Sequence, residues 1–302
     1  MSVQVPAIQI EALTYAYGRA EAVHDLNITV RRGRCYGLFG RNGAGKTTTM
    51  KCLLNLLRPQ HGQVRVFGLD PLRDEVAVKQ KLAYVPDQVA FYPWMSVRDA
   101  LTYFASFRPR WNHKLEAELI ERFRLDPEKR TSALSKGQRT QVALIAAVCP
   151  ETELLVLDEP TSGLDPIVRR EFIETVIGAY QESDPGNRTI LVSTHLITEF
   201  EGLIDEFTIV DAGRVVLTLE ADTARERFQR VHARFRQPVP EVEFAGALHV
   251  RREGRDLDLI VKQGGKELIE DLRRREPESL TAESLTLEEI FVTVLQPQGG
   301  GR

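Results

Sequence analysis

Long apolar runs are missing from this chain of 302 residues, and so is any excess of basic side chains. The longest apolar stretches lie near Leu144–Val148 and Leu154–Leu157, whereas a helix that spans a bilayer needs about 20 such residues. A net charge of −3 gives no sign of a broad nucleic-acid-binding surface. The first residues lack the basic and apolar regions of a signal peptide. We therefore expect a soluble, cytoplasmic protein with no nucleic-acid partner.

Cysteine and histidine are also scarce and scattered. The three cysteines, Cys35, Cys52 and Cys149, each lie in an apolar segment and form no C-x-x-C pair. The six histidines show no paired ligand spacing. This pattern argues against a disulfide framework and against a zinc site built from protein side chains alone.

One glycine-rich segment has a specific chemical meaning. Gly40–Thr47 fits the phosphate-loop pattern G-x-x-x-x-G-K-[ST] at every fixed position. An apolar strand is expected before it at Cys35–Phe39, and a helix after it at Thr48–Leu57, ending before Pro59. Glycines let successive N–H groups point into one concavity, and the helix adds the positive end of its dipole. The predicted ATP-binding residues here are Gly40, Arg41, Asn42, Gly43, Ala44, Gly45, Lys46, Thr47 and Thr48.

Two acids follow a second apolar strand. Leu154–Leu157 leads directly into Asp158 and Glu159, at the strand end where ligands bind in parallel sheets. Asp158 is suited to hold Mg²⁺ together with the Thr47 hydroxyl, and Glu159 to polarise a water for attack on the γ-phosphate. The alternative is an acid pair that caps a following helix.

A second anion-binding helix start is predicted at Leu134–Gln138. Ser135 and the N–H groups of Gly137 and Gln138 precede the apolar spacing of a helix over Gln138–Val148. The segment read alone favours an ordinary N-cap. One ATP does not need two cradles on one chain, but two chains packed head-to-tail could each complete the other's nucleotide site.

The remaining pattern predicts an α/β fold. Antiparallel strands are expected at Ile8–Leu13 and Val23–Val30, a helical subdomain at about 89–150, and a mostly parallel core sheet flanked by helices. Residues 1–220 are predicted to form this domain. A small α+β accessory domain is expected over 221–295, and a disordered tail over 296–302. The accessory domain could regulate the first domain, stabilise a dimer, or only pack against it.

These residues carry a resemblance to a known family. Gly40–Thr47, Leu134–Gln138, Leu154–Glu159, Ser162–Asp165 and His195 occur in the order and rough spacing of ABC-type ATPases. The chain resembles the nucleotide-binding subunit of an ABC transporter over about residues 7–220, and most of all the branch that exports drugs, antimicrobial peptides and sodium. Lys136 departs from the commonest signature, L-S-G-G-Q, as it does elsewhere in this branch.

The resemblance implies further roles for single residues. Tyr17 matches the aromatic that stacks on adenine, with Tyr15 as a competitor, and His195 matches the switch histidine that contacts the γ-phosphate. Asp165 matches the loop that links the two sites of a dimer. The signature residues Ser135, Lys136, Gly137 and Gln138 would contact ATP.

A Mg²⁺-contacting glutamine usually follows the Tyr-x-Pro of this family directly. Here Asp87 stands at that position and Gln88 comes next, and either carries an oxygen ligand. We favour Gln88, so that the predicted metal ligands are Thr47, Gln88 and Asp158. The aromatic-rich segment Val89–Met95 would either receive a helix of the membrane subunit or pack internally.

The sequence therefore predicts an ATPase that powers a membrane exporter, with ATP and Mg²⁺ as cofactors and Glu159 and His195 as catalytic residues. Its partners would be a second copy of itself and a separate integral permease. It would lie on the cytoplasmic face of the inner (plasma) membrane. The alternative is a soluble ABC ATPase acting on ribosomes or DNA. We favour it less because the chain has one cassette and no sustained heptads.

Overall fold

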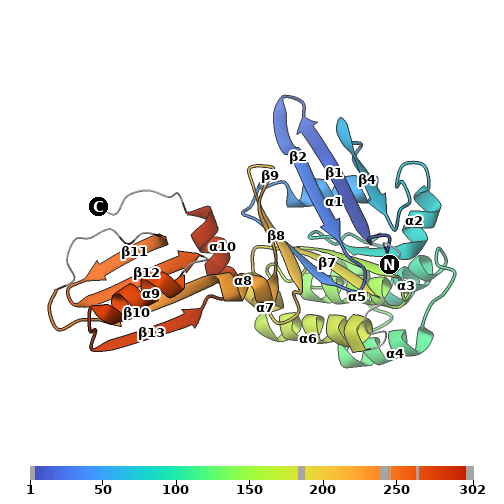
Figure 1. Cartoon of the computed structure of the whole chain (residues 1–302). Helices are drawn as coiled ribbons and strands as arrows, with labels where there is room; N and C mark the ends of the chain where they lie inside the picture. Colours follow the sequence, from blue (N-terminus) through green and yellow to red (C-terminus); the bar gives the residue numbers. More distant parts are fainter. Residues whose placement is uncertain (1–3, 183–187, 239–243, 245, 263–264, 297–302) are drawn as a thin grey trace. The chain divides into compact units, whose positions relative to one another are not determined.

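The computed structural model describes residues 4–182, 188–238, 244, 246–262 and 265–296 (Figure 1). The chain divides into two compact units, Met1–Val216 and Leu217–Arg302. Residues 297–302 of the predicted tail lie outside the described residues.

A six-stranded sheet forms the centre of the first unit. Its strand order is β5-β6-β7-β3-β8-β9, and the pairs from β5 to β8 are parallel. Every residue of β3, β6 and β7 is buried, as expected for strands covered on both faces. The mostly parallel core predicted from the apolar runs is confirmed, although β8 and β9 were not predicted. The strands are β3 (Cys35–Phe39), β5 (Leu82–Val85), β6 (Leu154–Asp158), β7 (Thr189–Thr194), β8 (Glu206–Asp211) and β9 (Arg214–Glu220).

An antiparallel sheet packs beside the helix that follows the phosphate loop. It has the order β2-β1-β4, with β1 (Ile8–Tyr17), β2 (Ala20–Val30) and β4 (His61–Val66). Its inward residues, such as Ile8 and Val30, share one hydrophobic cluster with Met50 and Leu53 of α1 (Lys46–Leu53). Burial of this shared apolar surface fixes α1, and with it the loop that precedes the helix.

The helix after the phosphate loop ends earlier than predicted. It runs over Lys46–Leu53, not to Leu57. Asn55 takes a left-handed φ of 56°, the N–H of Leu56 donates to the Lys51 carbonyl at 2.8 Å, and that of Asn55 to the Cys52 carbonyl at 3.2 Å. These are the two hydrogen bonds of a Schellman motif, which stops a helix by satisfying its last carbonyls. The apolar spacing continues past this stop, so periodicity alone misplaced the end.

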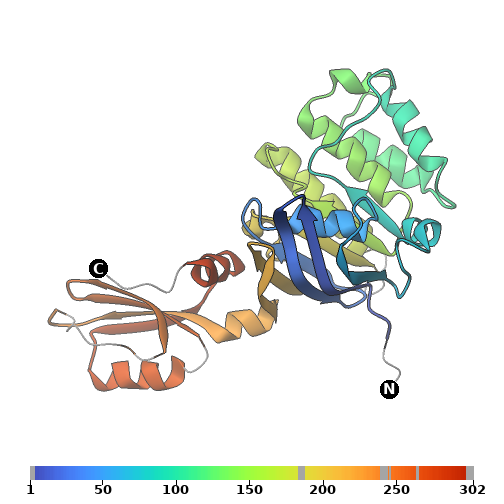
Figure 2. The same cartoon turned by 90° about the horizontal axis from the view of Figure 1, so that it is seen from above.

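Most of the other helices of the first unit were predicted from their spacing. Figure 2 shows the helices α3 to α5, in teal and green, gathered apart from the antiparallel sheet. Residues Ser96 and Asp99 form a capping box at the start of α3, and Asn112 caps α4. The helices are α2 (Glu75–Lys81), α3 (Val97–Ala105), α4 (His113–Arg122), α5 (Lys136–Val148), α6 (Pro166–Ile177) and α7 (Ile197–Phe200), of which α2 and α7 were not predicted.

The second unit is an antiparallel sheet with a helix packed on it. Its strand order is β11-β12-β10-β13, and its core joins Val231, Leu257 and Leu259 to Leu268 and Leu272 of α9. Apolar residues that alternate with polar ones over 231–235, 248–250 and 257–261 predict three of these strands, but the sequence predicted neither β13 nor α8. The elements are α8 (Ala221–Arg227), β10 (Phe228–Arg234), β11 (Ala247–Glu253), β12 (Asp256–Lys262), α9 (Gly265–Arg274), β13 (Ser279–Ser284) and α10 (Leu287–Leu295).

Candidate functional site

The phosphate loop connects β3 to the start of α1, and its backbone needs glycine. Gly43 and Gly45 have φ angles of 81° and 100°, which residues with a Cβ rarely adopt. A Cβ on Gly45 would lie 2.4 Å from the Ala22 carbonyl oxygen, and one on Gly40 would lie 2.6 Å from that of Val210. The loop is therefore a concave turn that no larger residue could form at these positions. It leads into the positive end of α1, which suits an anion.

Lys46 points its ammonium group back across this loop. Its Nζ donates to the carbonyl oxygens of Gly40 at 2.7 Å and Arg41 at 3.3 Å. The same Nζ lies 3.0 Å from Glu159 Oε1, and the Lys46 side chain is only 5% exposed. A charge held this far from water interacts more strongly with nearby anions than a surface lysine does.

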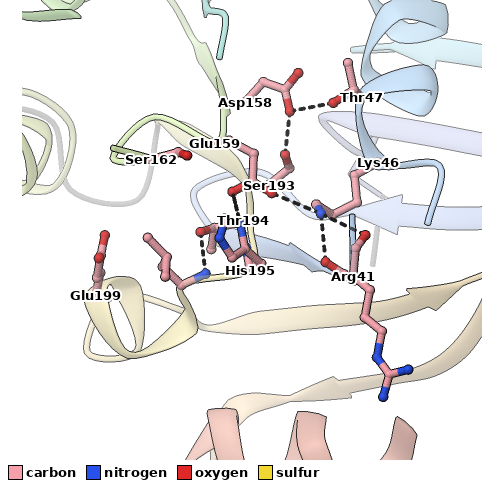
Figure 3. A network of polar contacts seen from close by, with 12 residues as sticks. Arg41, Lys46, Thr47, Asp158, Glu159, Ser162, Ser193, Thr194, His195 and Glu199 are labelled. Atoms are coloured by element: carbon pink, nitrogen blue, oxygen red, sulfur yellow. Dashed lines mark hydrogen bonds and ion pairs between the residues drawn. The ribbon is translucent and has the colours of Figure 1, made fainter. Parts of the chain in front are cut away.

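Asp158 ends β6 and accepts hydrogen bonds from three hydroxyl groups, of which Figure 3 shows those of Thr47 and Ser193. Its Oδ1 accepts from Thr47 at 3.1 Å and from Ser193 at 2.7 Å, and its Oδ2 accepts from the Tyr84 phenol at 3.4 Å. Burial raises the pKa of the Asp158 carboxyl above its usual range, and its hydrogen bonds from Ser193 and Thr47 oppose that shift. Burial likewise raises the pKa of Tyr84, and the negative charge of Asp158 adds to the effect.

Glu159 has an unusual backbone and two different carboxylate environments. Its φ is 46°, a strained value for a residue with a Cβ, and its N–H donates to the Ser193 carbonyl at 2.9 Å. Oε2 lies 2.7 Å from His195 Nδ1. Oε1 is buried and, apart from its ion-pair distance to Lys46, has no hydrogen-bond partner among the described residues. A buried acceptor with spare capacity is suited to hold a proton or a water.

The second predicted cradle is a well-capped helix start. Ser135 Oγ accepts from the Gln138 N–H at 3.1 Å, and the Gln138 side chain accepts from the Ser135 N–H at 3.2 Å. This is a capping box, so the ordinary N-cap interpretation holds, and the exposed Ser135 hydroxyl still has a proton to donate. Lys136 Nζ donates to the Ser162 carbonyl at 2.6 Å, which ties this helix start to the loop after Glu159.

Two of the residues identified by resemblance, Tyr17 and Asp165, stand at the end of a strand and at the start of a helix. Tyr17 ends β1, is 49% exposed, and meets Tyr15 edge-to-face at 4.9 Å between ring centroids. Tyr17 belongs to the hairpin of β1 and β2. The carbonyl group of Ala22 on β2 packs against Gly45 of the phosphate loop. Asp165 caps α6 by accepting from the N–H groups of Ile167 and Val168 at 3.0 and 3.1 Å.

The two candidates after the Tyr-x-Pro segment differ in their surroundings. Gln88 is exposed, whereas Asp87 is half-buried. The negative charge of Asp87 is among the causes that raise the pKa of Asp158 and of Tyr84. Asp87 is therefore electrostatically coupled to the site.

Sequence reasoning missed two members of the cluster, Ser193 and Tyr84. Both lie on strands next to β6, where Ser193 pairs directly with Asp158 and Tyr84 with Val156. A polar residue at the carboxyl end of an otherwise apolar strand was the available signal for Ser193. For Tyr84 the signal was weaker, because an aromatic residue is ordinary in a strand.

No helix in the described part of the chain is long and apolar enough to cross a membrane. No group of three or more histidine, cysteine, aspartate or glutamate side chains among the described residues is arranged to hold a metal ion.

Comparison with known proteins gives consistent matches. A family model for ABC transporters matches residues 23–162. The bacitracin transport ATP-binding protein BcrA of Bacillus licheniformis is 32% identical over 73% of this chain and 72% of that protein. The daunorubicin resistance ATP-binding protein DrrA3 of Streptomyces coeruleorubidus is 34% identical over 74% of this chain and 73% of that protein. A solved ATP-binding subunit of an ABC transporter matches with a TM-score of 0.66 and 27% identity, over 73% of this chain and 92% of that one.

Proposed function

Because this chain belongs to the ABC transporter family of ATP-binding proteins, we propose that it is the ATP-hydrolysing subunit of a membrane exporter. Members of this family bind and hydrolyse ATP to power transport. The observation that carries the proposal is the convergence of Lys46, Asp158, Glu159 and His195 on one end of the parallel sheet. Relatives named for bacitracin transport and daunorubicin resistance support export, and the comparisons give no support to a ribosome or DNA partner.

The phosphate loop would hold the phosphates of ATP. Its glycine cradle excludes side chains, its N–H groups and the start of α1 favour an anion, and Lys46 is placed to reach the β- and γ-phosphates. Tyr17 would stack its exposed ring on adenine. Glu159 would accept a proton from the attacking water, and His195 would hold Glu159 and contact the γ-phosphate.

Thr47 and Asp158 would hold Mg²⁺. Both offer hard oxygen ligands 3.1 Å apart, as that ion prefers. Gln88 or Asp87 would complete the protein ligands, and the electrostatic coupling of Asp87 to Asp158 supports Asp87 as much as Gln88. When bound, the metal would neutralise the charge that develops on the phosphates.

Replacing Asp158 with asparagine should raise the stability of the metal-free protein and lower its ATPase activity. Because the folded pKa of Asp158 is raised, its negative charge is disfavoured by folding at neutral pH, and a neutral side chain of the same shape removes that cost. We expect Asp158→Asn to raise the metal-free unfolding midpoint by about 2–4 °C. Mg²⁺-dependent ATPase activity should fall at least about 100-fold. Thermal unfolding with EDTA and steady-state ATPase assays measure the two effects, and a variant less stable than the parent without metal would contradict the pKa argument.

Two copies would be needed for a complete site. Ser135, Lys136, Gly137 and Gln138 form an exposed helix start with donors to spare, and Asp165 lies beside it in an exposed loop. In a head-to-tail dimer these residues would contact the nucleotide on the partner's phosphate loop. Lys136 would then exchange its Ser162 carbonyl for a phosphate oxygen.

An apolar cavity in the first unit would receive the permease. It has a volume of about 580 Å³ and lies between α2, α3, α5 and the segment after β5, with Val76, Phe91, Phe107 and Ala146 among its lining residues. Val76 and Phe107 are 70% and 64% exposed, more than an internal packing surface requires. We propose that a short helix of an integral permease occupies it, so that the chain works peripherally on the cytoplasmic face of the membrane.

A single charge in this cavity should abolish membrane attachment. We expect Val76→Glu to keep its basal ATPase activity, because Val76 is far exposed and outside the catalytic cluster. The variant should co-sediment less with vesicles that hold its integral permease partner, with affinity falling about 10-fold or more. Val5→Glu, at an exposed valine outside the cavity, is the matched control. Equal binding by both variants would contradict the proposed docking site.

A further inference from the structure

Arg169 and Glu199 form a partly buried ion pair outside the catalytic cluster. Arg169 lies in the first turn of α6, and its Nη1 lies 2.5 Å from Oε1 of Glu199 on α7. The Glu199 side chain is 9% exposed, and that of Arg169 is 31% exposed. The pair joins two helices that each begin just after a proposed site residue, because α6 follows Asp165 and α7 follows the turn of His195.

The chemistry of the pair does not suit a purely stabilising role. Arg169 Nε and both oxygens of Glu199 make no hydrogen bond of good geometry with any residue that the structure describes. Buried charges with unused hydrogen-bonding capacity are costly, and an ion pair of this kind often stabilises a fold no better than apolar side chains would. A role in placing the two connected loops gives a physical reason for the arrangement.

The Arg169 guanidinium holds both loops at once. While Nη1 faces Glu199, Nη2 donates to the carbonyl oxygen of Leu164 at 3.1 Å. Leu164 directly precedes Asp165, so the guanidinium also fixes the backbone of the segment Ser162–Asp165, which we call the Asp165 loop. A lysine would hold the two acceptors less rigidly, because its donors lie on one atom at the end of a flexible stem and lack the planar fork of arginine.

On the other side, Glu199 is connected to the histidine by a very short path. Figure 3 shows Glu199 on the single-turn helix that comes immediately after His195. The N–H of Glu199 donates to the Leu196 carbonyl at 3.3 Å, and the Leu196 N–H donates to Thr194 Oγ1 at 2.9 Å. His195 lies in the chain between Thr194 and Leu196, and its Nδ1 lies 2.7 Å from Glu159 Oε2.

We propose that Arg169 and Glu199 are positioning residues that hold the Asp165 loop and the His195 turn in a fixed relation. A shift of the Asp165 loop at the proposed dimer interface would then be transmitted to His195 by the Arg169 guanidinium and the Glu199 carboxylate. The inference rests on the roles proposed above for Asp165 and His195. Neither member of the pair contacts the phosphate loop, so the pair acts on turnover and not on nucleotide affinity.

The test removes both charges together, because a single substitution would leave the other charge buried and unpaired. We expect Arg169→Gln with Glu199→Gln to fold and to bind ATP·Mg²⁺ within about threefold of the parent, while kcat falls about 10- to 100-fold. The matched control is Arg170→Gln with Glu174→Gln, which removes an exposed ion pair of 2.9 Å from the same helix and with it the exposed contact of Glu174 to Arg122. That control should leave kcat unchanged.

The same double substitution in a His195→Ala background distinguishes positioning from general damage. If the pair acts through the histidine, the double substitution should lower kcat of the His195→Ala protein by less than a further twofold. The effects of sites that depend on each other are not additive. A folded double variant with unchanged kcat, or an equal loss in both backgrounds, overturns the positioning role. Unimpaired turnover in His195→Ala alone would contradict the proposed function as well.

A milder variant keeps the proposal testable if the double variant does not fold. Arg169→Lys retains a cation beside Glu199, so the fold should survive. It loses the planar fork that spans Glu199 and the Leu164 carbonyl. We expect kcat to fall about 10-fold at unchanged nucleotide affinity. Turnover equal to that of the parent would overturn the proposal.

Discussion

Replacing Glu159 with glutamine should abolish ATP turnover and leave ATP binding intact. Glutamine fills the same space and can keep a hydrogen bond to His195, but its neutral amide cannot take a proton from water. We expect kcat to fall about 10²- to 10⁴-fold. The nucleotide would then persist, so ATP and Mg²⁺ should trap a dimer that size-exclusion chromatography with light scattering detects.

The control for this variant is Glu118→Gln, at an exposed carboxylate on α4. It should hydrolyse ATP at the parental rate and show no trapped dimer. A Glu159→Gln protein that remains monomeric with ATP and Mg²⁺ would contradict the two-copy site. One that remains fully active would remove Glu159 from the proposed mechanism.

Removing the Lys46 ammonium should eliminate ATP binding itself. The side chain is 5% exposed, and its Nζ is held at the mouth of the loop by the carbonyls of Gly40 and Arg41. A charge-assisted contact contributes about 1.5–3 kcal/mol, so the loss of two phosphate contacts corresponds to a rise in Kd of about 10²-fold or more. A fluorescent ATP analogue measures this Kd directly.

Lys51→Ala is the matched control, because Lys51 lies in the last turn of the same helix. It should bind the analogue with an affinity close to that of the parent. Lys46→Ala also leaves Glu159 without its nearby cation, so we expect any residual ATP to be hydrolysed slowly. Parental affinity in Lys46→Ala would contradict the proposed phosphate site, whereas loss of affinity in both variants would point to general damage to α1.

The amino-acid sequence by itself determined the local parts of this protein. The chain from Cys35 to Lys46 specifies a strand, a glycine turn and a helix start, because each depends on residues that are neighbours in the chain. The alternation at Ile8–Leu13 and the apolar run at Leu154–Leu157 specified strands for the same reason. The stop of α1 at Leu53 was also encoded locally, by the left-handed Asn55, but apolar periodicity concealed it.

Only the tertiary structure decided which side chains meet. Thr47 contacts Asp158 from 111 residues away, and Ser193 reaches the same carboxylate because β6 and β7 pair with Asp158 opposite Ser193. The ion pair between Arg169 and Glu199 likewise depends on the tertiary placement of α6 and α7, whose residues lie 30 positions apart in the chain. Local propensities fix the elements but not the strand order or the register. Strand order and register are set by the burial of whole apolar faces. The free energy of that burial is a sum over segments that are distant in the chain, so no single stretch of sequence reveals it.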